Sequence, residues 1–290
     1  MSERPVVVDA HQHFWDPARF DYFWMTGGET APLRRPFGPD DLAPLLVEAG
    51  VDATVLVQAV QRVDETRWLL ETAAATPFVA GVVGWVDLLD PDVGETLAEL
   101  KARPAGRYLV GIRHMVQDEP DPDWLLRPEV ARGLRAVAEA ELVYDLLLKP
   151  PQIAAATRLC AALPEVRFVV DHLAKPPIAS REVGPWAALM APFGEMPHVA
   201  CKLSGMVTEA DRASWAPSDL ASYVAEAVRL FGEERLLFGS DWPVCTLAAG
   251  YAQVKGALEA ALEEVYGGPL AATTRKRIFG ENAREFYGLY

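Results

Sequence analysis

Eight short apolar runs recur along the chain, each followed by a segment with helical spacing. The runs are rich in valine, isoleucine and leucine without strict alternation, which is typical of strands buried on both faces of a parallel sheet. They cover residues 6–14, 53–60, 78–86, 109–115, 142–149, 166–173, 198–206 and 236–242. The helical segments cover 39–49, 64–75, 91–103, 128–140, 151–163, 217–231 and 253–266, and several have proline at or near the first turn.

This alternation favours an α/β fold, a single (β/α)8 TIM barrel that forms one domain over residues 1–290. A doubly wound open sheet is the competing arrangement. Eight units of roughly 30 residues each, with no composition break between them, favour the barrel. A final helix over residues 273–286 is expected to close the bottom or the side of the barrel.

Composition excludes several classes of partner. A net charge of −14 argues against binding to nucleic acid or to an anionic membrane surface. No apolar run approaches the ~18 residues that cross a bilayer, and residues 1–5 lead into the first run without the apolar core of a signal peptide. Three cysteines are too few and too scattered for a disulfide framework. We therefore expect a cytoplasmic protein, and assembly into a homo-oligomer stays open.

The first apolar run ends in two histidines, His11 and His13. Successive side chains on a strand point to opposite faces, so these two imidazoles are expected to project the same way. Two imidazoles on one face can share one ion or one substrate. The motif is short, however, and pairs of ordinary polar residues also occur at strand ends.

Polar residues also gather at the ends of later runs. The carboxyl ends of the strands form the active face of a TIM barrel. Charged side chains are costly to bury unless they are paired or ligated, so a polar cavity is expected there. His198 starts its run instead of ending it, and we expect it to be structural. The residues at or near the later run ends are Arg113, His114, Lys149, Asp171, His172, Lys202, Ser204, Ser240 and Asp241.

This set of residues favours hydrolysis. Imidazoles and one carboxylate can hold a divalent ion that lowers the pKa of water, with Asp241 as the proton acceptor. Alternatively, the histidines polarise a carbonyl by hydrogen bonds alone. Arg113, Lys149 or Lys202 could stabilise the negative charge that develops on the carbonyl oxygen or hold a substrate carboxylate. The sequence contains neither a Gly-x-Ser-x-Gly nucleophile motif nor a phosphate-binding glycine motif.

Several motifs together resemble the amidohydrolase superfamily, and within it the lactonase branch that contains L-fuconolactonase-like and L-rhamnonolactonase-like proteins. They are DAHQHFWDP at 9–17, ATVLVQAV at 53–60, ETRWLLE at 65–71, GWVDL at 84–88, GIRHMVQ at 111–117, DHLAKPP at 171–177, CKLSGM at 201–206 and FGSDWPVC at 238–245. The joint occurrence of the first, the sixth and the last is specific, and the resemblance covers nearly the whole chain.

The resemblance implies a TIM barrel that opens sugar-acid lactones of the L-fucono, L-rhamnono or galactono type with activated water. It implies a site built from the first-strand histidines, the sixth-strand histidine and the eighth-strand aspartate, which could hold a single divalent ion such as zinc. The metal ligands would be His11, His13, His172 and Asp241. The fifth run ends in Lys149 where binuclear members carry a histidine, so a two-metal centre is not expected. A mechanism without metal stays open.

We assign the remaining roles on this basis. The catalytic residues are expected to be Asp241, His172 and His114. The substrate-binding residues are expected to be Arg113, Lys149, Trp15, Trp24, Trp85 and Trp242, with the tryptophans forming the pocket wall. Core packing is the competing role for each tryptophan.

Two other functions compete with a sugar lactonase. The same scaffold could hydrolyse a pyrone-derived or muconate-derived lactone dicarboxylate, or carry out a metal-dependent decarboxylation. Such substrates would need several cations in the pocket, and Arg113, Lys149, Lys175 and Lys202 are the candidates. A barrel that binds a sugar acid without catalysis is a different class of answer, which the intact aspartate and histidines disfavour.

Overall fold

The computed structural model describes residues 5–289, and the expectations for residues 1–4 lie outside this range. Eight parallel strands pair in sequence order to form the predicted TIM barrel. They are β1 Val8–Gln12, β2 Ala53–Val57, β3 Val79–Gly84, β4 Leu109–His114, β5 Val143–Leu146, β6 Phe168–Val170, β7 Val199–Leu203 and β8 Leu236–Phe238. Backbone bonds just beyond β8 close the barrel, because Asp241 N–H donates to His11 O at 2.8 Å and His13 N–H to Trp242 O at 2.7 Å.

Helices surround this barrel. They are α1 Pro39–Ala49, α2 Val63–Ala75, α3 Val93–Ala102, α4 Pro128–Glu139, α5 Ile153–Ala162, α6 Val183–Gly194, the short α7 Met206–Glu209, α8 Pro217–Phe231 and α9 Tyr251–Tyr266. Proline occupies the first turn of α1, α4 and α8, where its missing N–H costs no hydrogen bond. Helix α6 was not among the predicted segments, and it contains Gly184, Pro185 and Pro192, which weaken a helical pattern. Within residues 5–289, no helix has the length and apolar character needed to span a membrane.

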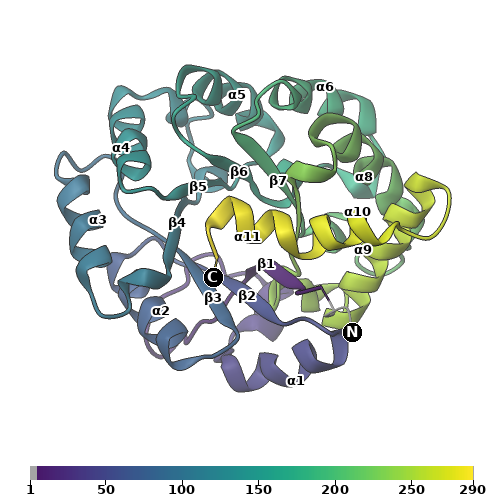
Figure 1. Cartoon of the computed structure of the whole chain (residues 1–290), viewed down its shortest axis with the longest axis horizontal. Helices are drawn as coiled ribbons and strands as arrows, with labels where there is room; N and C mark the ends of the chain where they lie inside the picture. The colour runs from purple at the N-terminus through teal and green to yellow at the C-terminus, as the bar shows by residue number, and fades with distance from the viewer. Residues whose placement is uncertain (1–4, 290) are drawn as a thin grey trace.

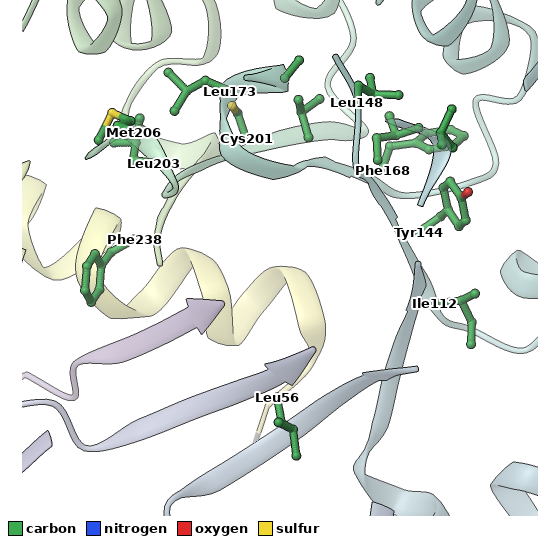
Figure 2. Close-up of a cluster of buried hydrophobic side chains, with 14 of the residues drawn as sticks. Leu56, Ile112, Tyr144, Leu148, Phe168, Leu173, Cys201, Leu203, Met206 and Phe238 are labelled. Atoms are coloured by element: carbon green, nitrogen blue, oxygen red, sulfur yellow. The ribbon is translucent and has the colours of Figure 1, made fainter. Parts of the chain in front are cut away.

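The larger apolar core lies between the barrel and its helices. Figure 2 shows its side chains pointing away from the barrel axis, among them Leu56, Ile112, Tyr144, Phe168 and Phe238. Each of these five side chains is fully buried. Helices cover the outer face of the strands and side chains fill the barrel interior. Both faces are therefore buried, and the apolar runs of the sequence do not alternate between apolar and polar residues.

A second, smaller apolar core fills the bottom of the barrel. Alanine and valine side chains of the strands meet Ala283, Tyr287 and Leu289 there. In Figure 1 the C-terminal segment crosses the end of the barrel that faces the viewer. The predicted closing helix is therefore present, but it consists of α10 Ala272–Lys276, a π turn Arg277–Glu281 and α11 Asn282–Tyr287. In that turn, a side chain at Gly280 would meet Val6 O at 2.0 Å, so only glycine allows this close approach.

An ionic layer lies above this plug, between it and the mouth of the barrel. The Lys202 ammonium is 2.6 Å from Asp145 Oδ2 and 3.0 Å from Asp171 Oδ1, and all three side chains are fully buried. Tyr287 donates its hydroxyl to Asp145 at 2.7 Å, and Arg113 pairs with Asp171 at 3.1 Å. Burial raises the pKa of Asp171, but Lys202, His11 and Arg113 outweigh burial and hold this pKa well below its usual range.

A bulge in β1 makes Asp9 and His11 face different sides of the strand. Asp9 pairs with Thr54 and Gln12 with Leu56, so β1 contains one residue more than β2 over this interval. Asp9 consequently faces away from the ionic layer and accepts hydrogen bonds from Ser240 Oγ at 2.6 Å and Tyr251 Oη at 2.8 Å. His11 faces the interior, where its Nδ1 lies 3.2 Å from Asp171 Oδ1.

We predict that Lys202→Met destabilises the fold by about 3–5 kcal/mol, because it leaves buried carboxylates without their cation. Urea unfolding of wild type and variant measures the difference. Lys175→Met is the matched control, since Lys175 is partly exposed and lies 3.8 Å from its partner Glu209. Equal losses in the two variants would contradict the role given to the ionic layer.

Glu65 supports a pH-dependent prediction. Its Oε2 accepts hydrogen bonds from the N–H groups of Ala59 and Val60, which ties the end of β2 to α2. Burial raises the pKa of Glu65 from 4.5 to about 8, against these bonds. The folded state thus holds a proton that the unfolded chain releases, and the resulting stability is complete below pH 4.5 and lost as the pH rises through about 8.

From about pH 5 to about pH 8.5, the free energy of unfolding of the wild type should therefore fall by roughly 2–4 kcal/mol more than that of Glu65→Gln. Urea titrations at several pH values measure both slopes. Glu263→Gln on the surface should retain the wild-type slope. The role of Glu65 would be refuted by parallel curves for wild type and Glu65→Gln.

Candidate active site

A pocket opens beyond the carboxyl ends of the strands, on the face that barrel geometry predicts. Its walls come from the ends of β1, β2, β4, β5, β6 and β8 and from the loops that follow them. The lining residues are His13, Trp24, Ala59, Arg113, Met115, Gln117, Leu147, His172, Lys175, Asp241 and Val244.

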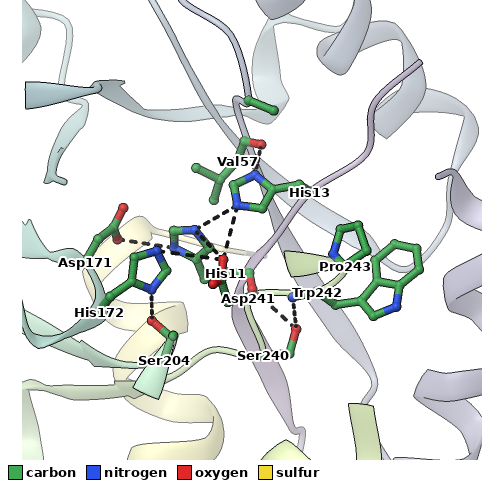
Figure 3. A network of polar contacts seen from close by, with 12 residues as sticks. His11, His13, Val57, Asp171, His172, Ser204, Ser240, Asp241, Trp242 and Pro243 are labelled. Carbon is green, nitrogen blue, oxygen red and sulfur yellow. Dashed lines mark hydrogen bonds and ion pairs between the residues drawn. The ribbon is translucent and has the colours of Figure 1, made fainter. Parts of the chain in front are cut away.

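Three histidines and one aspartate meet at the floor of this pocket (Figure 3). The Nε2 atoms of His11 and His13 lie 3.2 Å apart, so the two imidazoles share one face as expected. Asp241 Oδ1 lies 3.4 Å from His13 Nε2. It lies 3.8 Å from Nε2 of His11 and 3.8 Å from Nε2 of His172. The structure thus brings together the four residues that the sequence suggested as metal ligands.

The partner of His13 locates one of its protons, whereas both nitrogens of His11 lie near cations. The carbonyl oxygen of Val57 lies 2.7 Å from His13 Nδ1 and can only accept, so this nitrogen carries a hydrogen. The Arg113 guanidinium, which can only donate, lies 3.3 Å from His11 Nε2. The other nitrogen of His11, Nδ1, lies 3.2 Å from Asp171 Oδ1 and 3.2 Å from the Lys202 ammonium. The Nε2 atoms of both imidazoles face Asp241.

This arrangement suits a cation. Two imidazole nitrogens and a carboxylate oxygen converge at the pocket floor, and these are donor atoms that divalent metal ions bind. Two ligand atoms at about 2.0–2.1 Å from a tetrahedral zinc ion are about 3.3 Å apart, close to the distances of 3.2–3.8 Å seen here. The carboxylate of Asp171 orients His11 as second partners of metal-bound histidines usually do. The cluster can therefore hold one divalent ion.

Burial determines the charge of these groups. It lowers the pKa of His172 to about 4 and lowers the pKa of His11 well below its ordinary value, so both are neutral at neutral pH. Burial raises the pKa of Asp241, but His172 and His13 outweigh it and this pKa lies well below its usual range. Asp241 is consequently an anion beside the neutral imidazoles of His11 and His172.

Strained backbone directs two of the four side chains. His172 has φ of 53° and Asp241 has φ of 57°, both in the left-handed region. Such conformations cost about 1–3 kcal/mol each and persist where the surroundings enforce them, often at functional sites. Gly205 is part of those surroundings, because a Cβ at this position would lie 2.6 Å from His172 Nδ1.

The other predicted polar residues have different places. Arg113 lines the pocket, with its guanidinium also bound to Asp171 and to a backbone carbonyl. Lys149 is 51% exposed, pairs loosely with Asp118 at 3.7 Å and does not line the pocket. Lys202, which the sequence offered as a substrate-binding cation, belongs instead to the buried ionic layer.

His114 also lies outside the pocket lining. Its ring stacks on Trp124 at 4.2 Å, its Nδ1 accepts from Trp85 Nε1 and its Nε2 donates to Glu119 at 2.7 Å. Arg113 precedes it on β4, and neighbouring residues of a strand face opposite sides. Both nitrogens of His114 are thus engaged away from the site, and the catalytic role expected for it has no support from its position.

Only one of the four tryptophans expected in the wall lines the pocket. Trp24 does so and donates its indole N–H to Ala59 O at 2.8 Å. Trp15 and Trp242 are buried in the core, at 1% and 2% exposure. The indole N–H of Trp85 donates to His114 Nδ1. Core packing, the competing role, accounts for Trp15 and Trp242.

Part of the pocket lining was not predicted from the sequence. Met115, Gln117, Leu147 and Val244 were not among the expected site residues, although they follow strands β4, β5 and β8 closely. The rule that loops after barrel strands form the active face could have identified their segments. Which of their side chains face the pocket depends on packing between loops.

Comparison with known proteins identifies the family of this chain. The family model for amidohydrolases matches residues 8–289. An L-fucono-1,5-lactonase of Burkholderia ambifaria is 41% identical, over 97% of this chain and 94% of that protein. An L-fucono-1,5-lactonase of Burkholderia multivorans is 38% identical, over 97% of this chain and 96% of that protein.

A solved structure supports the same relationship. The crystal structure of an amidohydrolase from Burkholderia multivorans with bound zinc is 37% identical and has a TM-score of 0.90. The match covers 98% of this chain and 100% of that chain. The resemblance that the sequence motifs suggested is confirmed, and the chain belongs to the amidohydrolase family.

Proposed function

We propose that this chain is a lactonase that opens L-fucono-1,5-lactone, or a closely related sugar lactone, to the aldonic acid. Two L-fucono-1,5-lactonases at 41% and 38% identity, matched over nearly their whole length, support this substrate class. The observation that carries the proposal is the position of Asp241. Its carboxylate is buried at the pocket floor beside three imidazoles, which suits a base that acts on water.

The proposed reaction needs one proton acceptor and one group that stabilises negative charge. Asp241 takes a proton from water as the water oxygen attacks the lactone carbonyl carbon. The guanidinium of Arg113, which lines the pocket, stabilises the charge that develops on the carbonyl oxygen. When the bond between the carbonyl carbon and the ring oxygen breaks, Asp241 returns the proton to that ring oxygen.

A single zinc ion is part of the proposal, with His11, His13, His172 and Asp241 as the residues that would hold it. When bound, such an ion supplies a Lewis acid that polarises the lactone carbonyl and lowers the pKa of water. Asp171 Oδ1 lies 3.2 Å from His11 Nδ1 on the side away from the pocket, and Ser204 Oγ, 2.9 Å from His172 Nδ1, orients that ring.

The charges around the pocket favour a neutral lactone over a dicarboxylate. Of the four cations that the sequence offered for a dicarboxylate or a decarboxylation substrate, Lys202 belongs to the buried ionic layer and Lys149 does not line the pocket. Arg113 lines the pocket but is the cation assigned above to the carbonyl oxygen. Lys175 lines it but lies 3.8 Å from Glu209. Trp24 with other apolar lining side chains suits the carbon skeleton of a deoxy sugar.

The cysteines support the proposed cytoplasmic location. Cys160, Cys201 and Cys245 are all buried free thiols. Burial raises the pKa of the Cys160 and Cys245 thiols, which makes them unreactive. Such residues suit a reducing compartment.

We predict that Asp241→Asn lowers kcat for L-fucono-1,5-lactone by about 10²–10⁴-fold, because the amide cannot accept the proton of water. The rate of acid release at constant pH measures this loss. Asp123→Asn, at an exposed aspartate that pairs with Arg158, is the matched control and should keep full activity. If wild type and Asp241→Asn were equally fast, or if the wild type bound aldonic acids without opening any lactone, the proposal would fail.

Removal of metal is the second test. We expect about one zinc per chain in the purified protein and loss of lactonase activity after chelation, with recovery when zinc is added back. His13→Asn and His172→Asn should lose zinc, as elemental analysis would show. His198→Asn, at a histidine that bonds to Cys160 O far from the pocket, should keep it. Full activity in a metal-free preparation would support the mechanism without metal.

A further inference from the structure

Gln117 has an unusual position in the pocket wall. It lines the pocket beyond β4, and its Oε1 is buried without a hydrogen-bond partner within residues 5–289. A buried acceptor without a partner costs about 1–3 kcal/mol, so proteins rarely keep one without a reason. A ligand that donates a hydrogen bond to this oxygen would remove that cost.

The backbone around Gln117 is held by three hydrogen bonds from other loops. Met115 N–H donates to Gln61 Oε1 at 2.8 Å, and Gln152 Nε2 donates to Val116 O at 2.8 Å. Gln117 N–H donates to Leu147 O at 3.0 Å. Hydrogen bonds from the loops that follow β2 and β5 thus fix the backbone of residues 115–117. The side-chain amide of Gln117 is therefore attached to a backbone that is already ordered, and such preorganisation favours the recognition of one specific ligand group.

The other polar groups of the pocket cannot serve in its place. Arg113 and Lys175 are donors only. Asp241 and the imidazole lone pairs are committed to the reaction and to the cation site. The hydroxyl groups of a sugar lactone must donate as well as accept, so the pocket needs a neutral acceptor away from the reacting carbonyl. Gln117 Oε1 is an acceptor of this kind.

We propose that Gln117 Oε1 accepts a hydrogen bond from one ring hydroxyl of the lactone and makes the enzyme specific for a substrate that carries it. This inference rests on the proposed lactonase function and adds a specificity residue to it. Met115 and Leu147 line the pocket as well and offer no side-chain hydrogen-bond partner comparable to an amide. A lactone that lacks the hydroxyl would leave the oxygen of Gln117 unpaired and would bind less well.

The test compares L-fucono-1,5-lactone with its 2-deoxy, 3-deoxy and 4-deoxy analogues. The wild type should prefer the parent lactone over one of these analogues by about 10- to 100-fold more in kcat/KM than Gln117→Met does. The change should fall mainly on KM, since the hydroxyl does not react. Gln117→Glu keeps an acceptor and should retain the preference, and Gln253→Met on the exposed face of α9 should behave as wild type.

Two outcomes would overturn the inference alone, provided that the wild type opens the parent lactone. One is an unchanged preference among the four lactones in Gln117→Met. The other is an equal slowing of all four lactones, which a purely structural effect would produce. Circular dichroism and zinc content check that the variant is folded. A wild type that opens none of the lactones would overturn the proposed function and this inference with it.

Discussion

The buried ammonium of Lys202 is the interaction on which the rest of the structure depends. It joins β7 to carboxylates on β5 and at the end of β6, and through Asp145 it reaches Tyr287 of the C-terminal plug. Burying an ion in a protein interior costs several kcal/mol of hydration free energy, and only well-placed partners of opposite charge offset that cost. The ionic layer therefore favours the strand register that brings these charges together. The same layer contacts His11, whose Nδ1 lies 3.2 Å from Lys202 Nζ and from Asp171 Oδ1.

The same layer explains the charge of the pocket. Among the described residues of the barrel interior, the carboxylates Asp145, Asp171 and Asp241 face the cations Lys202 and Arg113. The ion pairs of Lys202 and Arg113 are with Asp145 and Asp171, and the carboxylate of Asp241 lies beyond them at the pocket floor. A divalent ion or a proton from water is the natural partner of that charge. The charge that a cation would meet at this floor thus depends on the whole interior as well as on the four candidate ligands.

Much of this architecture could be predicted from the sequence, because strands buried on both faces and proline-started helices have clear local patterns. His11, His13, His172 and Asp241 could be placed together because all follow the same end of the barrel. The alternation of side chains on a strand could also have separated Arg113 from His114, since only one of two neighbours faces the interior.

The fate of Lys202 could not be predicted in this way. A lysine near a strand end is equally compatible with substrate binding and with a buried ion pair. Its burial depends on Asp145, which lies within the fifth apolar run and gave no polar signal at a strand end. The bulge in β1 likewise arises from pairing with β2, and it turns Asp9 away from the interior although strict alternation would have put it beside His11.

Two different devices position the four residues at the pocket floor. The pleat of β1 and its continuation direct His11 and His13, so their placement follows from the strand itself. Strand β6 ends at Val170 and β8 at Phe238, and left-handed backbone conformations turn His172 and Asp241 into the pocket beyond these ends. The strain of these turns is maintained by close packing, including the space that Gly205 leaves beside the His172 ring. The geometry of these four residues consequently depends on neighbours such as Gly205, because these hold the turns in a conformation that the chain would not adopt alone.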